Sequence, residues 1–426
     1  MELIVKPSIK DWNVLTIRPE KEQSQLEDLV KNIIKTVKTK GDTAIKNYSM
    51  QFDGVNLKQI KVSEREFQQS EFKCSEELKK AIQLAKSNIE TFHLAQKEKE
   101  KIIQTMQGVS CWRKSIGIEN VGLYIPGGSA PLFSTILMLG IPAKIAGCKN
   151  IVLCTPANAQ GEIHPAILYT AQLLGITNIY KVGGAQAIAA MAYGTQEIPS
   201  VDKIFGPGNQ YVTKAKALIQ QEGVAIDMPA GPSEVLVVTD GTGNPEFIAS
   251  DLLSQAEHGK DSQVILLSSD IEVLNKTLEE LDKQVRLLPR KDIAIEALKN
   301  SKAILLDSVD LCIEFSNQYA PEHLILAMDD FEDCIDQIRN AGSVFLGHYS
   351  CESAGDYASG TNHTLPTNGF AKSYSGVSLD SFVKKITFQK ITKLGIETIG
   401  PAIEIMAETE GLVAHKNAVS IRLNNL

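Results

Sequence analysis

The sequence predicts an α/β fold with two Rossmann-like units in tandem, each a doubly wound but incomplete parallel sheet. A helical N-terminal region precedes the two units, and a small C-terminal tail domain follows them. Three observations indicate this fold. Short β-rich segments alternate with helical segments from about residue 118, and a second series of the same kind begins near residue 233. The chain also has 426 residues, too many for one simple core.

The alternation sets the boundaries of both units. In the first unit, 118–232, the expected strands are VGLYI, IVLC, IYKV, KIF and VAID, and the expected helices are 131–146, 164–174, 184–193 and 209–221. In the second unit, 233–376, the expected strands are VLVV, QVILL, AILL, HLILA and SVFL, and the expected helices are 245–258, 271–284, 308–318 and 330–339. Two similar halves in tandem favour a ligand bound between them.

The segments outside the two units are assigned by their periodicity. Residues 1–23 form an arm without strong periodicity. Residues 24–117 are expected to be helical and to pack with the second α/β unit, since apolar residues recur at helical spacing before Gly41. Residues 377–426 form a tail with a helical pattern, in which AHKNAVSIRL is a candidate final strand.

Composition and charge exclude several classes of protein. Hydrophobic residues make up 43% and charged residues 22%, as in a soluble globular protein. The formal net charge of -8, with dispersed Lys and Arg, argues against nucleic acid as a partner. No apolar run reaches the length of a membrane span, and the N-terminus lacks a signal pattern. Seven scattered cysteines without a CxxC motif indicate reduced thiols and a cytoplasmic location.

The stretch DLLSQAEHGK carries the first candidate site. Asn244 is expected to cap its helix, and Asp251, Gln255 and His258 share one stripe. Gln255 and His258 would then lie in the last turn, close enough to share a small cation. The alternative is that both side chains satisfy backbone groups at the end of the helix.

The stretch APEHLILA carries the second candidate site. Glu322 and His323 lie at the start of an apolar strand, and an adjacent carboxylate and imidazole suit proton transfer near neutral pH. The alternative is a polar pair that merely begins the strand in a turn.

Two further stretches hold polar candidates. ESAGDYASGTNHTLPTNG, at 352–369, is expected to be a loop, in which Asp356 could bind a metal or a cationic group and His363 a substrate carboxyl or hydroxyl. The alternative is a turn-forming Asp and a surface His. In AETEGLVAHKN, Glu410 and His415 are spaced too loosely to form a motif on their own.

Three glycine-rich turns each follow a strand and precede a helix: YIPGGSAPL, VGGAQAIAA and FGPGNQYVTKA. In the first, Gly127 and Gly128 let the backbone approach a ligand, and helix N-termini favour anionic groups. Together the turns predict a nucleotide-binding rim, although the G-x-G-x-x-G pattern is absent. The alternative is tight turns kept for packing. Cys148 and Cys154, in AGCKNIVLCTP, are interpreted as buried structural thiols.

Long stretches of the chain resemble the histidinol dehydrogenase family. The resemblance spans essentially the whole sequence and rests on VGLYIPGGSAPLFSTILMLGIPAKIAGCK, VGGAQAIAAMAYGT, KIFGPGN, DMPAGPSEVLV, DLLSQAEHGKDSQVILL, APEHLI, AGSVFLG, ESAGDYASGTNH and AHKNAV. It implies an intertwined homodimer with one zinc ion per subunit, held by Gln255, His258, Asp356 and His415. It also implies that Glu410 and His415 act in the partner's pocket, so 377–426 would be a dimerisation tail.

The same resemblance implies the reaction. The family oxidises L-histidinol through L-histidinal to L-histidine with two NAD in turn, the last steps of histidine biosynthesis. His323 is the implied base for the hydroxyl proton, and Glu322 the implied activator of the water that adds to the aldehyde. The implied substrate contacts are Ser233, Gln255, His258, His323, Asp356, His363, Glu410 and His415. The implied NAD contacts are Tyr124, Gln186 and Asn209.

Two rival functions remain open on sequence alone. One is a thiol-dependent aldehyde dehydrogenase that uses Cys148 or Cys154 and needs no metal. The other is a binding module for zinc and an amino acid, without catalysis.

Overall fold

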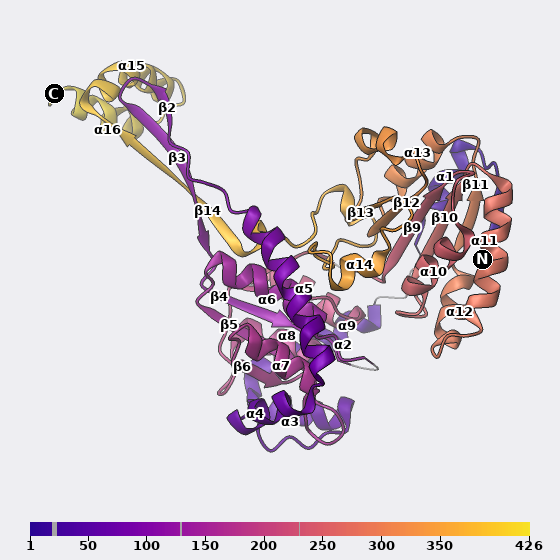
Figure 1. The fold of residues 1–426 in the computed structure, drawn as a ribbon. Helices are drawn as coiled ribbons and strands as arrows, with labels where there is room; N and C mark the ends of the chain where they lie inside the picture. Colours follow the sequence, from indigo (N-terminus) through magenta and orange to yellow (C-terminus); the bar gives the residue numbers. More distant parts are fainter. Residues whose placement is uncertain (19–23, 128–129, 230) are drawn as a thin grey trace.

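The computed structural model describes residues 1–18, 24–127, 130–229 and 231–426. Gly128, which the sequence places in the first glycine turn, lies outside the described residues. Two α/β units lie next to each other (Figure 1). A third part, the projecting part, is formed by residues 103–117 and 383–423 and extends away from both units on long strands. The predicted fold class, two parallel α/β units with flanking segments, is confirmed.

The first unit is built on a parallel sheet of strand order β6-β5-β4-β7-β8. These strands are β4 (Asn120–Tyr124), β5 (Asn150–Thr155), β6 (Asn178–Lys181), β7 (Lys203–Phe205) and β8 (Ala225–Ile226). Its helices are α6 (Ser134–Ala146), α7 (Pro165–Leu173), α8 (Gly184–Tyr193) and α9 (Gln210–Gln221). Alternate residues of β5 face opposite sides, so Leu153 joins one buried cluster and Cys154 the other.

The second unit has the parallel strand order β1-β11-β10-β9-β12-β13. Its strands are β1 (Glu2–Val5), β9 (Glu234–Thr239), β10 (Gln263–Ser268), β11 (Lys302–Leu305), β12 (His323–Ala327) and β13 (Ser343–Leu346). Its helices are α10 (Pro245–Ala256), α11 (Ile271–Val285), α12 (Lys291–Lys299), α13 (Val309–Tyr319) and α14 (Glu352–Tyr357), and the segment Phe331–Gln337 is a 3-10 helix.

The N-terminal arm, predicted without strong periodicity, is part of the second unit. Strand β1 pairs with β11, and Trp12, on the short helix α1 (Trp12–Leu15), is buried against Phe315 with ring centroids 5.3 Å apart. A strand of this length offers too few residues for a periodic pattern, so only its partner strand reveals it.

The prediction for 24–117 is wrong in two respects. Helices α2 (Ser24–Lys40), α4 (Glu64–Lys73) and α5 (Glu76–Ala95) contact α8, α7 and α6 respectively, so they mainly cover the first unit. Helix α5 also touches the second unit, where Asn88 Nδ2 donates to the carbonyl oxygen of Ala358 at 2.8 Å. Between them lie α3 (Asp42–Tyr48) and a one-turn π-helix, Ser49–Asp53. The end of this segment is also not helical, because it forms β2 (Ile103–Met106) and β3 (Val109–Gly117).

The C-terminal tail contains a strand where a helix was expected and a helix where a strand was expected. Its β14 (Val383–Ile391) pairs antiparallel with β3 and carries α15 (Lys393–Thr409) and α16 (Val413–Leu423). The candidate strand AHKNAVSIRL is therefore helical. Its Val419 and Leu423 pack on Gly400, where a side chain on α15 would crowd them. Within the described ranges, no helix is long and apolar enough to cross a membrane.

Candidate active site

A cluster of buried polar side chains lies in the second unit, where α10 ends and β12 begins. Asn244 caps α10 as predicted, and its Oδ1 accepts hydrogen bonds from the N–H groups of Glu246 and Phe247. The helix ends at Ala256 and not at residue 258. Gln255 therefore lies in its last turn, and His258 follows in the turn beyond it.

The segment 352–369, expected to be a loop, begins with the helix α14. Its Glu352 and Asp356 are one turn apart on this helix. One ligand atom from each of His258, Glu352 and Asp356 lies within 4.8 Å of the others. Glu352 is buried and accepts a hydrogen bond of 3.1 Å from Ser254 Oγ. Glu352 is not among the site residues predicted from the sequence, although its spacing of four residues from Asp356 is a signal for two carboxylates on one helix face.

Two buried polar atoms at this cluster have no hydrogen-bond partner in the described parts of the chain: Gln255 Oε1 and His323 Nε2. Buried polar atoms are normally paired, so these two point to a missing group. Amide and carboxylate oxygens with an imidazole nitrogen form a donor set that zinc accepts. Gln255, His258 and Asp356 therefore fit a divalent ion, and Glu352 adds negative charge beside them.

His415, the fourth predicted ligand, does not join this cluster within one chain. It lies on the exposed side of α16, which Figure 1 places at the end of the projecting part, away from α10 and α14. Glu410, at the end of α15, is exposed on the same part.

Glu322 and His323 lie at the amino end of β12, beside the first residue of β9. Glu322 Oε2 accepts a hydrogen bond of 2.9 Å from the N–H of Glu234. His323 Nδ1 lies 3.1 Å from the carbonyl oxygen of Glu234 and 2.9 Å from Nε2 of Gln255. His323 Nε2 lies 3.7 Å from Asp356 Oδ1. The base candidate and the metal-ligand candidates are thus direct neighbours.

The cluster shifts the protonation equilibria of its members. Burial raises the pKa of Glu322 to about 8 and that of Glu352 to about 7. Burial alone would lower the pKa of His323, but nearby carboxylates, foremost Glu322, outweigh it and raise the pKa to about 10. The same carboxylates would stabilise a bound cation.

His363 joins the two units next to this cluster. Its Nδ1 donates to the carbonyl oxygen of Asp356 at 3.0 Å, which leaves Nε2 to accept from Thr135 Oγ1 at 3.2 Å. Thr135 is in the first turn of α6, directly after the first glycine turn. Ser233 is half-buried just before β9, and its carbonyl oxygen accepts from the N–H of Gln263 at 3.1 Å.

The three glycine turns lie at the carboxyl ends of β4, β6 and β7. Tyr124 ends β4, and its hydroxyl accepts a hydrogen bond of 3.1 Å from the N–H of Gly184 in the second turn. A side chain at Gly206, in the third turn, would overlap the carbonyl of Tyr124. Gln186 is buried in the first turn of α8, and Asn209 caps α9 through its Oδ1. The turns therefore lie along the same edge of the sheet, where Pro156, after β5, sits between the first turn and the second.

Cys148 and Cys154, the thiols of the rival hypothesis, are both buried in the first unit. Burial raises the pKa of Cys148 to about 11 and that of Cys154 well above its ordinary value. Both are thus protonated at neutral pH, unlike a thiolate nucleophile.

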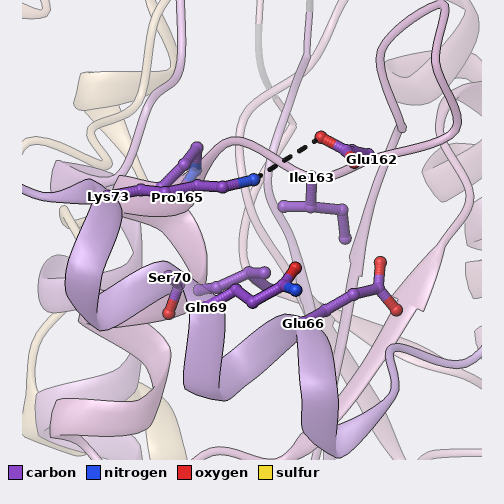
Figure 2. Close-up of a pocket in the computed structure, with 8 residues that line it drawn as sticks. Glu66, Gln69, Ser70, Lys73, Glu162, Ile163 and Pro165 are labelled. Carbon is purple, nitrogen blue, oxygen red and sulfur yellow. Dashed lines mark ion pairs between the residues drawn. The ribbon is translucent and has the colours of Figure 1, made fainter.

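A small surface hollow lies elsewhere on the first unit (Figure 2). Residues of α4, among them Gln69 and Lys73, line one side, and Glu162 and Ile163 line the other, with Lys73 Nζ 3.9 Å from Glu162 Oε2. The hollow contains none of the predicted site residues, and its ion pair between Lys73 and Glu162 is exposed to solvent.

Comparisons with known proteins agree with the resemblance found in the motifs. A family model described as histidinol dehydrogenase matches residues 16–423. A histidinol dehydrogenase from Bacteroides thetaiotaomicron is 57% identical over 426 residues, with 100% of both chains covered. One from Escherichia coli is 49% identical over 430 residues, with 98% of each covered. The crystal structure of histidinol dehydrogenase from Elizabethkingia anophelis superposes with a TM-score of 0.98 and 60% identity, covering 100% of this chain and 98% of that chain.

Proposed function

Because the chain belongs to the histidinol dehydrogenase family, we propose that it oxidises L-histidinol through L-histidinal to L-histidine, with zinc and NAD. This reaction would complete histidine biosynthesis. The observation that carries the proposal is the convergence of Gln255, His258 and Asp356 with the buried Glu322–His323 pair in one cluster. A base beside a cation site is what alcohol oxidation requires.

The metal would be held by Gln255, His258 and Asp356, with His415 supplied by a partner subunit. When bound, zinc would fix the imidazole and amino nitrogens of the substrate and so orient its reacting carbon. The unpaired Gln255 Oε1 supports this assignment. Ser233, His363 and Glu410 are the remaining proposed substrate contacts.

In the first oxidation, His323 takes the hydroxyl proton while the carbon gives its hydride to NAD. Its Nε2 faces the site unpaired and its Nδ1 is held from behind. A bound divalent cation would oppose the positive charge of the imidazole and lower its raised pKa, so that the neutral ring can accept the proton. Asp356, 3.7 Å from Nε2, stabilises the positive charge that the ring gains.

In the second oxidation, water must first add to the aldehyde, since an aldehyde has no hydroxyl proton to lose. Glu322 removes a proton from that water, and the hydrate then gives its hydride to a second NAD. Burial raises the pKa of Glu322 to about 8, which makes its carboxylate a stronger base than an exposed one.

The nucleotide would bind along the edge formed by the three glycine turns. Tyr124, Gln186 and Asn209 are its proposed contacts, one from each turn. The hydrogen bond between His363 and Thr135 brings this edge next to the cluster, so a nicotinamide could reach the substrate.

The projecting part would bind a second copy of the chain. It exposes large apolar side chains that a monomer has no reason to show to water: Met106, Phe388, Ile405, Met406, Val413 and Ile421. A homodimer through this part would bring His415 and Glu410 to the partner's pocket. The proposed location is the cytoplasm, where the unpaired thiols would stay reduced.

The direct test is to add L-histidinol and NAD to purified protein and to follow NADH and histidine. We expect both products, with NADH and histidine formed in a ratio of about two to one, since each oxidation transfers one hydride. Binding of zinc and histidinol without NADH formation would instead indicate a binding module.

Cys148→Ala and Cys154→Ala are expected to keep turnover within about threefold of the wild type, because neither thiol is ionised or close to the cluster. Initial rates of NADH formation, measured well below the melting temperature of each variant, check this. A loss of turnover in a folded single variant would revive the thiol mechanism.

A further inference from the structure

A buried ion pair lies behind the cluster, and the reaction just proposed does not use it. Arg18 Nε and Nη2 reach the two carboxylate oxygens of Glu234 at 2.9 and 3.0 Å. The side chain of Glu234 is 1% exposed and that of Arg18 is 13% exposed. A buried charge pair costs desolvation energy, so a pair in this place calls for a role beyond stability.

Glu234 contacts both members of the proton-transfer pair through its main chain. Its N–H donates to Glu322 Oε2 at 2.9 Å, and its carbonyl oxygen lies 3.1 Å from His323 Nδ1. Glu234 is the first residue of β9, where the chain enters the sheet. The main chain on both sides of the Glu234 Cα therefore sets where the carboxylate and the imidazole point.

The side chain of Glu234 ties that strand end to two other segments. Its Oε1 accepts a hydrogen bond of 3.0 Å from the N–H of Asn368, besides the one from Arg18. The Arg18 guanidinium lies over the ring of Tyr319, with its Cζ 3.7 Å from the ring centroid. Strand β9, the loop at residue 368 and the end of α13 thus meet at a single charge pair.

Arg18 also contacts the segment that leads into Glu322. Its Nη2 donates to the carbonyl oxygen of Ala320 at 3.4 Å. Ala320 has a φ of 57°, a left-handed conformation that costs energy for a residue with a side chain. The hydrogen bond from Arg18 is one way to hold this conformation. It acts on Ala320, two residues before Glu322.

We propose that Arg18 and Glu234 are positioning residues, which hold the Glu322–His323 pair in its reactive geometry from behind. Arg18 comes from the N-terminal arm, so this arm serves the active site as well as the sheet. The inference rests on the proposed function for its kinetic consequence, but the geometric part stands without it. The side chains of Arg18 and Glu234 make the contacts described above. None of these contacts is with a proposed metal ligand.

Glu234→Gln is the main test, because it keeps the side-chain shape and removes the charge. We expect kcat for histidinol to fall about 10- to 100-fold, the range found for supporting partners of a site. The KM for NAD and the zinc content should stay within twofold, since the glycine turns and the metal ligands are untouched. A purely structural pair would instead lower the melting temperature and leave kcat of the folded variant unchanged, and that outcome would overturn the proposal.

Arg18→Lys serves as the conservative variant. It keeps the positive charge but loses the two-pronged contact, so its kcat should lie between those of wild type and Glu234→Gln. Glu27→Gln is the matched control, because Glu27 also ties an N-terminal segment to an α/β unit, through Lys214 at 2.8 Å. Its kcat should equal that of the wild type. If Glu234→Gln does not fold, the comparison of Arg18→Lys with Glu27→Gln decides.

Crystal structures of wild type and of whichever of these two variants folds, Glu234→Gln or Arg18→Lys, give a readout that needs no turnover. We expect Glu322 and His323 to leave their contacts with the Glu234 main chain in the variant. Unchanged side-chain positions would overturn the proposal even if the wild type oxidises histidinol. Moved side chains in a protein that does not oxidise histidinol would uphold the positioning role and reject the proposed function.

Discussion

His258→Asn is expected to lose bound zinc and to lower turnover of histidinol at least about 100-fold, because substrate orientation depends on the metal. His258 shares its 4.8 Å cluster with Glu352 and Asp356, and the Asn side chain is shorter and lacks the imidazole nitrogen. Elemental analysis of the purified variant gives the metal content, and NADH formation gives the rate.

The matched control for this variant is His348→Asn. His348 pairs with Asp329 at 3.1 Å outside the cluster, so both zinc content and turnover should stay at the wild-type level. Dialysis of the wild type against a chelator should reproduce the loss, and added zinc should reverse it. Full turnover in protein shown to be free of metal would contradict the assignment.

Glu322→Gln is expected to slow the oxidation of histidinal much more than that of histidinol. Removing a general base costs about 10²- to 10⁴-fold in the step that needs it. Glu322 is proposed to serve only the step in which water adds, whereas His323 serves the alcohol step. Supplying histidinol and histidinal in separate assays measures the two losses independently.

His323→Asn is the companion variant, and its larger loss should fall on the oxidation of histidinol. The two side chains are only 3.7 Å apart, so a variant that disturbs the other group would slow both steps. Equal losses in both assays, for both variants in folded protein, would count against separate roles.

Most strands of both sheets could be predicted from the sequence, because parallel strands buried on both faces read as short apolar runs. The cap of α10 could also be predicted, since Asn244 followed by Pro245 is a local signal. Strand β1 could not, because its four residues are too few to show a pattern and are identified as a strand only by their pairing with β11. The strands β2 and β14 are mostly exposed and β3 is mostly half-buried or exposed, so they lack the apolar alternation that identifies a strand.

The packing of α2, α4 and α5 onto the first unit also could not be predicted from the sequence. An apolar helix face shows that a helix is covered, but it does not show by which sheet. At the site, Gln255 with His258 and Glu322 with His323 stood out because each pair is close in sequence. Glu352 did not, since a single carboxylate in a segment rich in Ser and Gly looks like a turn residue.

The place of His415 also could not be predicted from its local sequence. Nothing in AETEGLVAHKN indicates which chain its side chains serve, and in the single chain α16 stands far from α14 (Figure 1). The exposed apolar side chains of the projecting part support the proposed dimer, because a partner surface would cover them.

We propose that each site combines residues of two chains, and purified heterodimers test this directly. A heterodimer of one His258→Asn chain and one His415→Asn chain keeps one intact site, so it should show about half the turnover of the wild type. A heterodimer of a doubly substituted chain and a wild-type chain keeps none and should be inactive. The reverse pattern, in which the first heterodimer is inactive and the second is half active, would show that each chain builds its site alone.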